Sequence, residues 1–337
     1  MTLETLHQRL LALGAKPLHY GYLYRALFGI VPWPDADNPK FPKPLRQALP
    51  DIKAEINAVL QVVDHQQGEE KDSLKLLFQL KDGHTIESVL LPREGVCVSS
   101  QVGCAVGCVF CMTGQSGLLR QLTDLEIVAQ VIEAKRLRPE TRKVVFMGMG
   151  EPSHNLKNVM SAIDFLGTYI QIPHKNLVLS TVGDQRVFDA LKASAVKPAL
   201  AISLHSTIKE KREKLLPRAG KISIDSLVDQ AESYARQTGY PIQYQWTLMH
   251  GVNDSDEELA NIRKLLSGKY ALMNFIPVNA VDNSPYRRPE WSRCQEMARI
   301  LKEAHILAKF RHSAAQDVEG GCGQLRYRHL QKEGKSL

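Results

Sequence analysis

The amino-acid sequence predicts an α/β protein in which a parallel sheet closes, fully or in part, into a barrel behind a small helical domain. Three observations lead to this prediction. From residue 96 onward, short apolar runs of strand length alternate with longer runs of helical period. The first part of the chain lacks that alternation, and 337 residues are more than one small domain needs. Because parallel neighbours need long crossover connections, the alternation indicates right-handed βα units.

Residues 1–70 are expected to form a helical accessory domain. Helical runs cover residues 3–13, 20–28 and 45–60. The stretch PWPDADNPKFPKP separates the second run from the third, and its prolines exclude a helix interior or a central strand.

Residues 71–95 are expected to form a strand-rich extension. Two β-rich runs, 74–80 and 85–91, flank the turn signal Asp82–Gly83.

Residues 96–330 are expected to form the barrel, and residues 331–337 a frayed tail. Thr123 and Glu126 make a capping box that predicts the start of a helix over 123–132. The candidate strands are 96–99, 143–147, 177–180, 199–203, 242–248, 272–276 and 307–311.

The charge balance favours a polyanionic partner, but only weakly. Forty-three Lys and Arg against 36 Asp and Glu give a formal charge of +7 and a pI near 9.0. No run approaches the roughly 18 apolar residues of a membrane span. The N-terminal stretch MTLETLHQRLLALG carries an early acid and is typical of an amphipathic helix rather than a signal peptide. We therefore expect a cytoplasmic protein without a membrane partner.

The six cysteines are too sparse for a disulfide scaffold and are unevenly placed. Four of them lie within fifteen positions, and Cys294 and Cys322 are distant. In a reducing cytosol, clustered cysteines indicate metal or redox chemistry. The clustered four are Cys97, Cys104, Cys108 and Cys111.

The segment CAVGCVFC spaces Cys104, Cys108 and Cys111 so that one loop offers three thiolates. Three thiolates can ligate three irons of a [4Fe–4S] cube and leave the fourth iron open to a substrate or cofactor. A zinc site is the alternative, although zinc usually takes four ligands, often paired at C-x2-C spacing.

The C-x3-C-x2-C spacing, with Phe110 before the last cysteine, resembles the signature of the radical S-adenosylmethionine (SAM) superfamily. The resemblance implies a partial (βα)6 barrel of parallel strands, with the cluster loop after the first strand. It also implies that the amino and carboxylate groups of SAM chelate the open iron. One electron from the cluster then cleaves SAM to methionine and a 5′-deoxyadenosyl radical.

The wider sequence resembles a divergent member of the RlmN/Cfr family, radical SAM methyltransferases that act on a ring carbon of adenine in RNA. The resemblance implies methylation of C2, less favourably C8, of an adenosine in 23S rRNA, with tRNA as a second candidate substrate. It also implies an RNA-binding role for residues 1–70 and an electron donor such as flavodoxin or ferredoxin. We expect a monomer. The runs that carry the resemblance are CVSSQVGC, GMGEP, LSTVG, AISLHS, GVNDS, NFIPVN and GCGQL.

The same resemblance assigns catalytic roles to Cys322, Cys97 and Glu87. It implies that one SAM methylates Cys322 and that the radical from a second SAM abstracts hydrogen from this S-methyl group. The carbon radical then adds to the ring, and Cys97 resolves the link as a transient Cys97–Cys322 disulfide, which a reductant reopens. Glu87 matches the base that removes the ring proton. Cys322 also sits in a Gly-Gly-Cys-Gly turn, where backbone can approach a ligand closely. Cys294 has no supporting motif and is expected to be a buried apolar residue.

The expected SAM-binding residues follow the ends of predicted strands, where barrel sites assemble. Glu151 matches the family's contact to the SAM amino group. His205 could instead be a satisfied core histidine, and Ser180 a helix N-cap. The expected set is Gly150, Glu151, Ser180, Ser203, Leu204, His205 and Asn279.

Basic residues and tyrosines are candidates for RNA contact. Tyr20, Tyr22 and Tyr24 in the N-terminal domain could contact RNA or simply pack. The candidates for phosphate contact are Arg93, Arg120, Lys211, Arg212, Arg218, Arg287, Arg288, Arg326 and Arg328.

Two other functions stay open from the sequence. One is a radical SAM enzyme with another substrate, such as a glycyl-radical activase, which would have no use for Cys97 and Cys322. The other is a non-catalytic iron–sulfur or zinc protein that binds RNA or senses redox state. The segment RHSAAQDVEGGCGQL, which lies near the expected substrate face, departs from the common family form.

Overall fold

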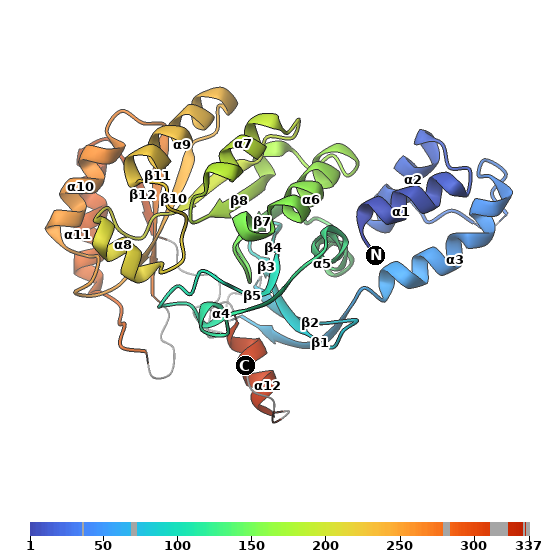
Figure 1. Ribbon diagram of the computed structural model, residues 1–337, viewed down its shortest axis with the longest axis horizontal. Helices are drawn as coiled ribbons and strands as arrows, with labels where there is room; N and C mark the ends of the chain where they lie inside the picture. Colours follow the sequence, from blue (N-terminus) through green and yellow to red (C-terminus); the bar gives the residue numbers. More distant parts are fainter. Residues whose placement is uncertain (36, 69–72, 279–283, 311–322, 333, 335–337) are drawn as a thin grey trace.

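The computed structural model describes residues 1–35, 37–68, 73–278, 284–310, 323–332 and 334. Within these residues one large twisted sheet runs through the molecule, with helices packed on its outer face (Figure 1). Its strands, in spatial order, are β1 (Leu60–Gln67), β2 (Leu74–Leu80), β3 (Thr85–Leu91), β4 (Gly95–Cys97), β7 (Lys143–Phe146), β8 (Leu177–Thr181), β9 (Ala199–Ser203), β10 (Ile242–Leu248), β11 (Ala271–Pro277) and β12 (Leu307–Phe310).

The sheet changes from antiparallel to parallel at β4. Strands β1 to β4 pair antiparallel in succession, and every pairing from β4 to β12 is parallel. The parallel part is the predicted barrel. The prediction of helix up to residue 60 is wrong at its end, because α3 stops at Asn57 and Leu60 is already the first residue of β1, an edge strand paired with β2. The sheet therefore begins inside the region predicted as the helical domain.

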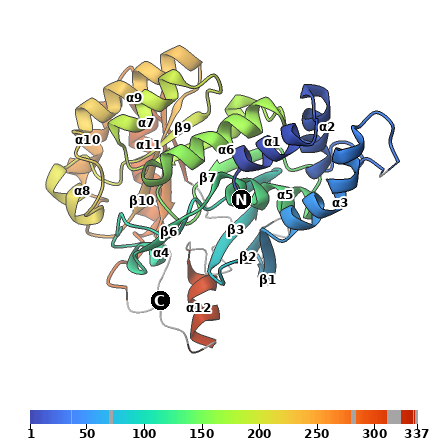
Figure 2. The same cartoon turned by 45° about the vertical axis from the view of Figure 1, so that its right-hand side comes forward.

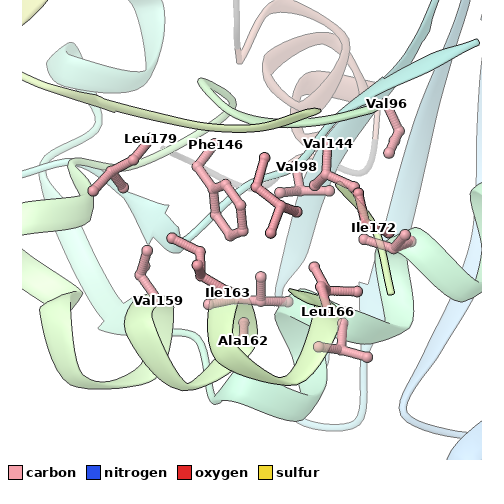
Figure 3. Packing of buried hydrophobic residues seen from close by; sticks show 14 of the residues in the cluster. Val96, Val98, Val144, Phe146, Val159, Ala162, Ile163, Leu166, Ile172 and Leu179 are labelled. Carbon is pink, nitrogen blue, oxygen red and sulfur yellow. The ribbon is translucent and has the colours of Figure 1, made fainter. Parts of the chain in front are cut away.

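Successive side chains of the parallel strands point to two opposite faces of the sheet, and both faces are apolar. Helices cover the outer face. Val144 and Phe146 of β7 pack in the main core, whereas Val145 between them faces the interior. Figure 3 shows α6 lying against the strands, with Ile163 and Leu166 pointing at these side chains. The larger helices are α5 (Asp124–Leu137), α6 (Leu156–Thr168), α7 (Gln185–Ala193), α8 (Lys209–Leu215), α9 (Ile224–Thr238), α10 (Asp256–Leu266), α11 (Trp291–Glu303) and α12 (Gln324–Lys332).

The N-terminal helices α1 (Leu3–Ala12), α2 (Pro17–Leu27) and α3 (Lys43–Asn57) lie at one side of the molecule, next to α5 and α6 (Figures 1 and 2). Tyr24 is only 2% exposed, and its ring contacts the rings of Phe165 and Tyr169 edge-on at 4.9 and 5.0 Å. Tyr20 also meets Tyr169 edge-on. The tyrosines were expected either to contact RNA or to pack within the protein. Tyr20 and Tyr24 pack against other aromatic side chains.

The start of α5 agrees with the signal in the sequence. Thr123 and Glu126 form the predicted capping box at the start of α5. No helix in the described part of the chain combines the length and the apolar character needed to cross a membrane.

Candidate active site

Part of the interior of the partial barrel is lined by Cys97 and small apolar side chains. Cys97 of β4 packs with Val145, Val178, Ala199 and Ala201, which belong to the next three strands. The Cys97 side chain is buried, as expected for a residue on the inward face of the first parallel strand. Val96 and Val98 point the other way, into the helix-covered core.

The loop that carries the cluster cysteines is closed at its base by a short ladder that the sequence did not predict. Strand β5 (Gln101–Gly103) pairs antiparallel with β6 (Leu118–Gln121), and the N–H of Cys104 donates to the carbonyl of Gly117 at 2.8 Å. Gly103 has φ +81°, and a Cβ there would lie 1.9 Å from the Gly117 oxygen. Only glycine fits this crossing of the two strands.

The three predicted ligands line one cavity of about 300 Å³, at the mouth of the parallel strands. Burial raises the pKa of all three thiols, that of Cys104 to about 12. The Glu87 carboxylate is a further, smaller cause for Cys111. A bound metal is therefore needed to hold these sulfurs as thiolates.

The donor set suits an iron–sulfur cube, which takes cysteine thiolates as its ligands. In the described part of the chain, no three His, Cys, Asp or Glu side chains are grouped to hold one metal ion. Cys104, Cys108 and Cys111 instead border a space at the lower end of the range for small-molecule sites. When iron is bound, these three residues would hold it, and the remaining cavity is available to SAM.

Most of the predicted SAM-binding residues border the same cavity. Gly150, Glu151, Ser180, Ser203 and His205 line it, at the ends of β7, β8 and β9.

Two predicted SAM-binding residues differ from these. Leu204 is fully buried and is not among the described residues that line the cavity, so a direct contact from its side chain is not supported. Asn279 lies outside the described residues.

Glu151 is a buried carboxylate fixed by three hydrogen bonds. Its Oε1 accepts from the N–H of Ser153 at 3.0 Å and from the Thr181 hydroxyl at 2.5 Å. Its Oε2 accepts from the N–H of Val182 at 3.1 Å. Because a carboxylate has about four acceptor positions, Glu151 can still accept one bond from a cavity ligand.

His205 is held as a neutral donor. The N–H of Thr247 donates to Nδ1 at 2.9 Å, so the neutral ring carries its proton on Nε2. Burial, and then the charge of Arg212, lower its pKa to about 3. The ring meets Phe110 edge-on at 4.9 Å. His205 is thus satisfied at one nitrogen and can donate from the other into the cavity.

Glu87 lies on β3 and contacts the start of α12. Its Oε2 accepts from the N–H of Gly323 at 2.8 Å, and its Oε1 accepts from the N–H of Arg326 at 2.7 Å. Lys75 of β2, 2% exposed, places its Nζ 3.7 Å from Oε2. No signal in the sequence pointed to Lys75, because a lysine in a strand normally faces solvent.

The residue after Cys322 reaches the cluster loop. A Cβ on Gly323 would lie 2.8 Å from Oγ1 of Thr113, which follows Cys111 and Met112. Thr113 lines the cavity and was not predicted. Cys322 itself lies outside the described residues.

Gln101 and Thr181 are further positioning residues that sequence reasoning missed. Oε1 of Gln101 accepts the N–H of Glu151 at 2.7 Å. Both residues fall inside the runs CVSSQVGC and LSTVG, so the signal was present in the motifs.

Some of the basic residues predicted to contact phosphates are instead buried inside the protein. Arg212 is 6% exposed, and its guanidinium donates to the carbonyls of Leu204, Val182 and Ser203. The prediction is wrong for Arg212, and it is not supported for the buried Arg326. Arg120 pairs with Asp82 and Glu126.

Known proteins resemble the chain over nearly its whole length. The model of the radical SAM superfamily matches residues 98–262. A probable RNA methyltransferase of Thiobacillus denitrificans is 56% identical over 98% of this chain and 91% of its own. A probable RNA methyltransferase of Aromatoleum aromaticum is 57% identical over 97% of this chain and 93% of its own. The crystal structure of a radical SAM methyltransferase from Sphaerobacter thermophilus aligns with a TM-score of 0.82 at 32% identity, over 96% of this chain and 97% of that one.

These matches confirm the predicted α/β fold, and they identify the cofactors as a [4Fe–4S] cluster and SAM. They favour neither the zinc alternative nor a non-catalytic protein. The chain belongs to the radical SAM superfamily and, within it, to the RlmN/Cfr-like family of RNA methyltransferases.

Proposed function

We propose that this RNA methyltransferase places a methyl group on a ring carbon of an adenosine, C2 rather than C8, with Cys322 as the carrier of the methyl group. The substrate that we favour is 23S rRNA, with tRNA as a second target. The names of the relatives support the RNA substrate, and the resemblance in motifs supports the adenosine.

The site has features that such a reaction needs. C2 of adenine is a poor nucleophile, so direct attack on the SAM sulfonium is not feasible. When bound, the cluster and SAM supply a 5′-deoxyadenosyl radical. The chain must then hold SAM beside the cluster, exclude water, and present a methyl-bearing sulfur to the same space. The cavity, with the buried side chains of Glu151 and His205 in its wall, suits the first of these tasks.

The observation that carries the proposal is the packing of Gly323 against Thr113. Gly323 is the covalent neighbour of Cys322, and Thr113 belongs to the loop of the three cluster cysteines. We assign to Cys322 the S-methyl group and the later bond to the ring. We assign to Cys97, whose thiol faces the barrel interior, the attack that frees the product and forms a Cys97–Cys322 disulfide for a reductant to reopen.

Other parts of the proposal rest on the family alone. Glu87 is the proposed base for the ring proton. A flavodoxin- or ferredoxin-type protein is the proposed electron donor, and residues 1–70 are the proposed RNA-binding domain. We expect a monomer in the cytoplasm, where clustered thiols stay reduced.

Nucleoside mass spectrometry tests the proposal. rRNA and tRNA from cells with and without the gene are digested, and methyladenosines are separated by position of the methyl group. We expect one C2-methylated adenosine to disappear without the gene, to return with the wild-type gene, and to stay absent with Cys322→Ala. Cys294→Ala is the matched control, since Cys294 is a buried cysteine of α11.

Methylation by Cys322→Ala at the wild-type level would overturn the role of Cys322. Reductive cleavage of SAM without any change in RNA would instead favour a radical SAM enzyme with another substrate.

A further inference from the structure

Glu87 connects two parts of the chain that lie far apart in the sequence. Each of its carboxylate oxygens accepts one backbone N–H from the first turn of α12, at 2.8 Å from Gly323 and 2.7 Å from Arg326, more than 230 positions away. Glu87 is 3% exposed and Lys75, its ionic partner, 2%. Both oxygens of this buried carboxylate are thus held by backbone N–H groups, with the Lys75 ammonium close to one of them.

The contact has the chemistry of a helix cap. The first N–H groups of a helix have no partner within the helix, and a carboxylate is the side chain that satisfies them best. The helix dipole adds to the attraction. Both hydrogen bonds are charge-assisted and buried, which makes them stronger than neutral ones. Glu87 thus contributes the cap of α12 from a strand of the barrel.

Gly323 is fixed from two sides. Its N–H is held by Glu87, and its Cα lies so close to Thr113 that a Cβ would be 2.8 Å from Oγ1 and 3.0 Å from the backbone nitrogen. With φ +94°, the residue has a backbone conformation that favours glycine. The residue that follows the predicted methyl carrier is therefore clamped between β3 and the cluster loop.

We propose that Glu87 is a positioning residue that holds Gly323, the covalent neighbour of Cys322, against the cluster loop. We call this contact of Glu87 with the N–H groups of Gly323 and Arg326 the α12 latch. The inference rests on the proposed function in one respect, namely that Cys322 receives the methyl group. It differs from the role of Glu87 as base, because the latch acts before RNA binds, when Cys322 is methylated.

The two roles predict different defects. A base that acts only on the ring proton is not needed for methylation of Cys322, so its loss would leave Cys322 methylated and would trap the RNA on the protein. A latch is needed for methylation of Cys322 itself. Loss of the latch also frees the first turn of α12. Loss of a residue that acts only as a base would leave that turn unchanged.

The test compares Glu87→Ala, Glu87→Gln and Asp124→Asn with the wild type, all carrying the cluster under anaerobic conditions. Glu87→Gln keeps the volume but turns one acceptor oxygen into a donor that faces an N–H. Asp124 is the matched control, because it is a buried carboxylate whose Oδ1 accepts the N–H of Leu3, at the start of α1, at 2.9 Å. Two quantities are measured: hydrogen exchange of residues 324–332, and the fraction of Cys322 that gains a labelled methyl group from SAM in the absence of RNA. The change in the electron paramagnetic resonance spectrum on SAM binding verifies an intact cluster.

We expect both Glu87 variants to exchange the first amides of α12 about tenfold faster, and to lose about tenfold or more of Cys322 methylation, while the spectrum still responds to SAM. Asp124→Asn should speed exchange at the starts of α1 and α5, where the carboxylate accepts the N–H groups of Leu3 and Leu125, and should leave α12 exchange and Cys322 methylation near the wild-type level.

Unchanged exchange of α12 in Glu87→Gln would overturn the latch. Faster exchange with wild-type methylation of Cys322 would overturn the positioning role, and RNA trapped on the variant would then assign Glu87 as the base. If the wild type itself never methylates Cys322, the proposed function fails, and the exchange data still decide whether the latch exists.

Discussion

The hydroxyl of Thr181, at the end of β8, donates a hydrogen bond of 2.5 Å to Oε1 of Glu151, in the loop after β7. Thr181 is fully buried and is not among the described residues that line the cavity. It acts on the site through Glu151. Thr181→Val keeps the shape but removes the donor, so Glu151 loses one of the three bonds that orient it.

We expect Thr181→Val to weaken SAM binding about tenfold, as one hydrogen bond to a charged group is worth about 1.5–3 kcal/mol. Equilibrium dialysis of SAM against the anaerobic, cluster-loaded protein measures the dissociation constant. Thr141→Val is the control, because Thr141 is equally buried and its hydroxyl donates to the carbonyl of Arg138, away from the site. Equal SAM affinity of both variants would remove Thr181 from the account of the site.

The crossing of β5 and β6 at Gly103 predicts a loss of the cluster on substitution. In Gly103→Ala the new Cβ would lie 1.9 Å from the Gly117 oxygen that accepts the Cys104 N–H. The ladder must open, and the loop then no longer presents its thiols together. We expect the iron content, near four per chain in the wild type, to fall below about one after anaerobic reconstitution.

The control for this substitution is Gly239→Ala. Gly239 also has a positive φ, +71°, but no atom lies within 4 Å of its would-be Cβ. Both variants suffer the backbone strain of about 1 kcal/mol, whereas only Gly103→Ala suffers the collision. A full cluster in Gly103→Ala would show that the β5–β6 ladder does not support the cysteine loop.

The buried neutral His205 makes stability depend on pH. Its pKa is lowered to about 3 in the folded protein, first by burial and then by Arg212, and is about 6.5 in the unfolded chain. Below pH 6.5 the unfolded state binds the proton more readily, so the free energy of unfolding falls as pH falls. The loss spans the window from about pH 6.5 down to about pH 3 and reaches about 2 kcal/mol at pH 5.

His205→Asn isolates this contribution. Asparagine tolerates the positive φ of +59° at this position and has no titrating proton. Urea unfolding at pH 7.5 and pH 5 should show the stability advantage of the wild type shrinking by about 2 kcal/mol. A gap that stays constant between the two pH values would mean that His205 is not held neutral.

The buried guanidinium of Arg212 predicts a defect in stability without a defect in RNA contact. In Arg212→Gln the carbonyls of Leu204, Val182 and Ser203 lose their shared donor, at a cost of about 3 kcal/mol in unfolding free energy. Arg287 is exposed and is a matched candidate for a phosphate contact. The dependence of RNA affinity on salt should lose about one unit of slope in Arg287→Gln and none in Arg212→Gln. The reverse result would return Arg212 to the RNA surface.

Much of the sheet could be read from the sequence because its strands are apolar and short. The runs 74–80, 85–91, 199–203 and 242–248 match β2, β3, β9 and β10 residue for residue. The strand β1 was missed because LQVVDHQQ is largely polar, as an exposed edge strand can be. The short β5–β6 ladder was missed because three residues carry no periodic signal.

The candidate active site likewise contains residues that the sequence indicates and contacts that it does not. Cysteine spacing and the runs shared with the family mark residues that line the cavity, so Cys104, Glu151 and His205 could be named. The contact between Glu87 and α12 could not, because hydrogen bonds from a side chain to backbone N–H groups of distant residues leave no trace in residue type. The exposure of Arg212 was misjudged because an arginine is normally solvated.

The most direct measurement uses SAM with a fully deuterated methyl group and counts deuterium in the methylated adenosine. If Cys322 carries the methyl group and gives up one hydrogen atom before the carbon joins the ring, the product methyl retains two deuterium atoms and the third appears in 5′-deoxyadenosine. A product that retains all three would show direct transfer from SAM to RNA, and it would contradict the radical route through Cys322.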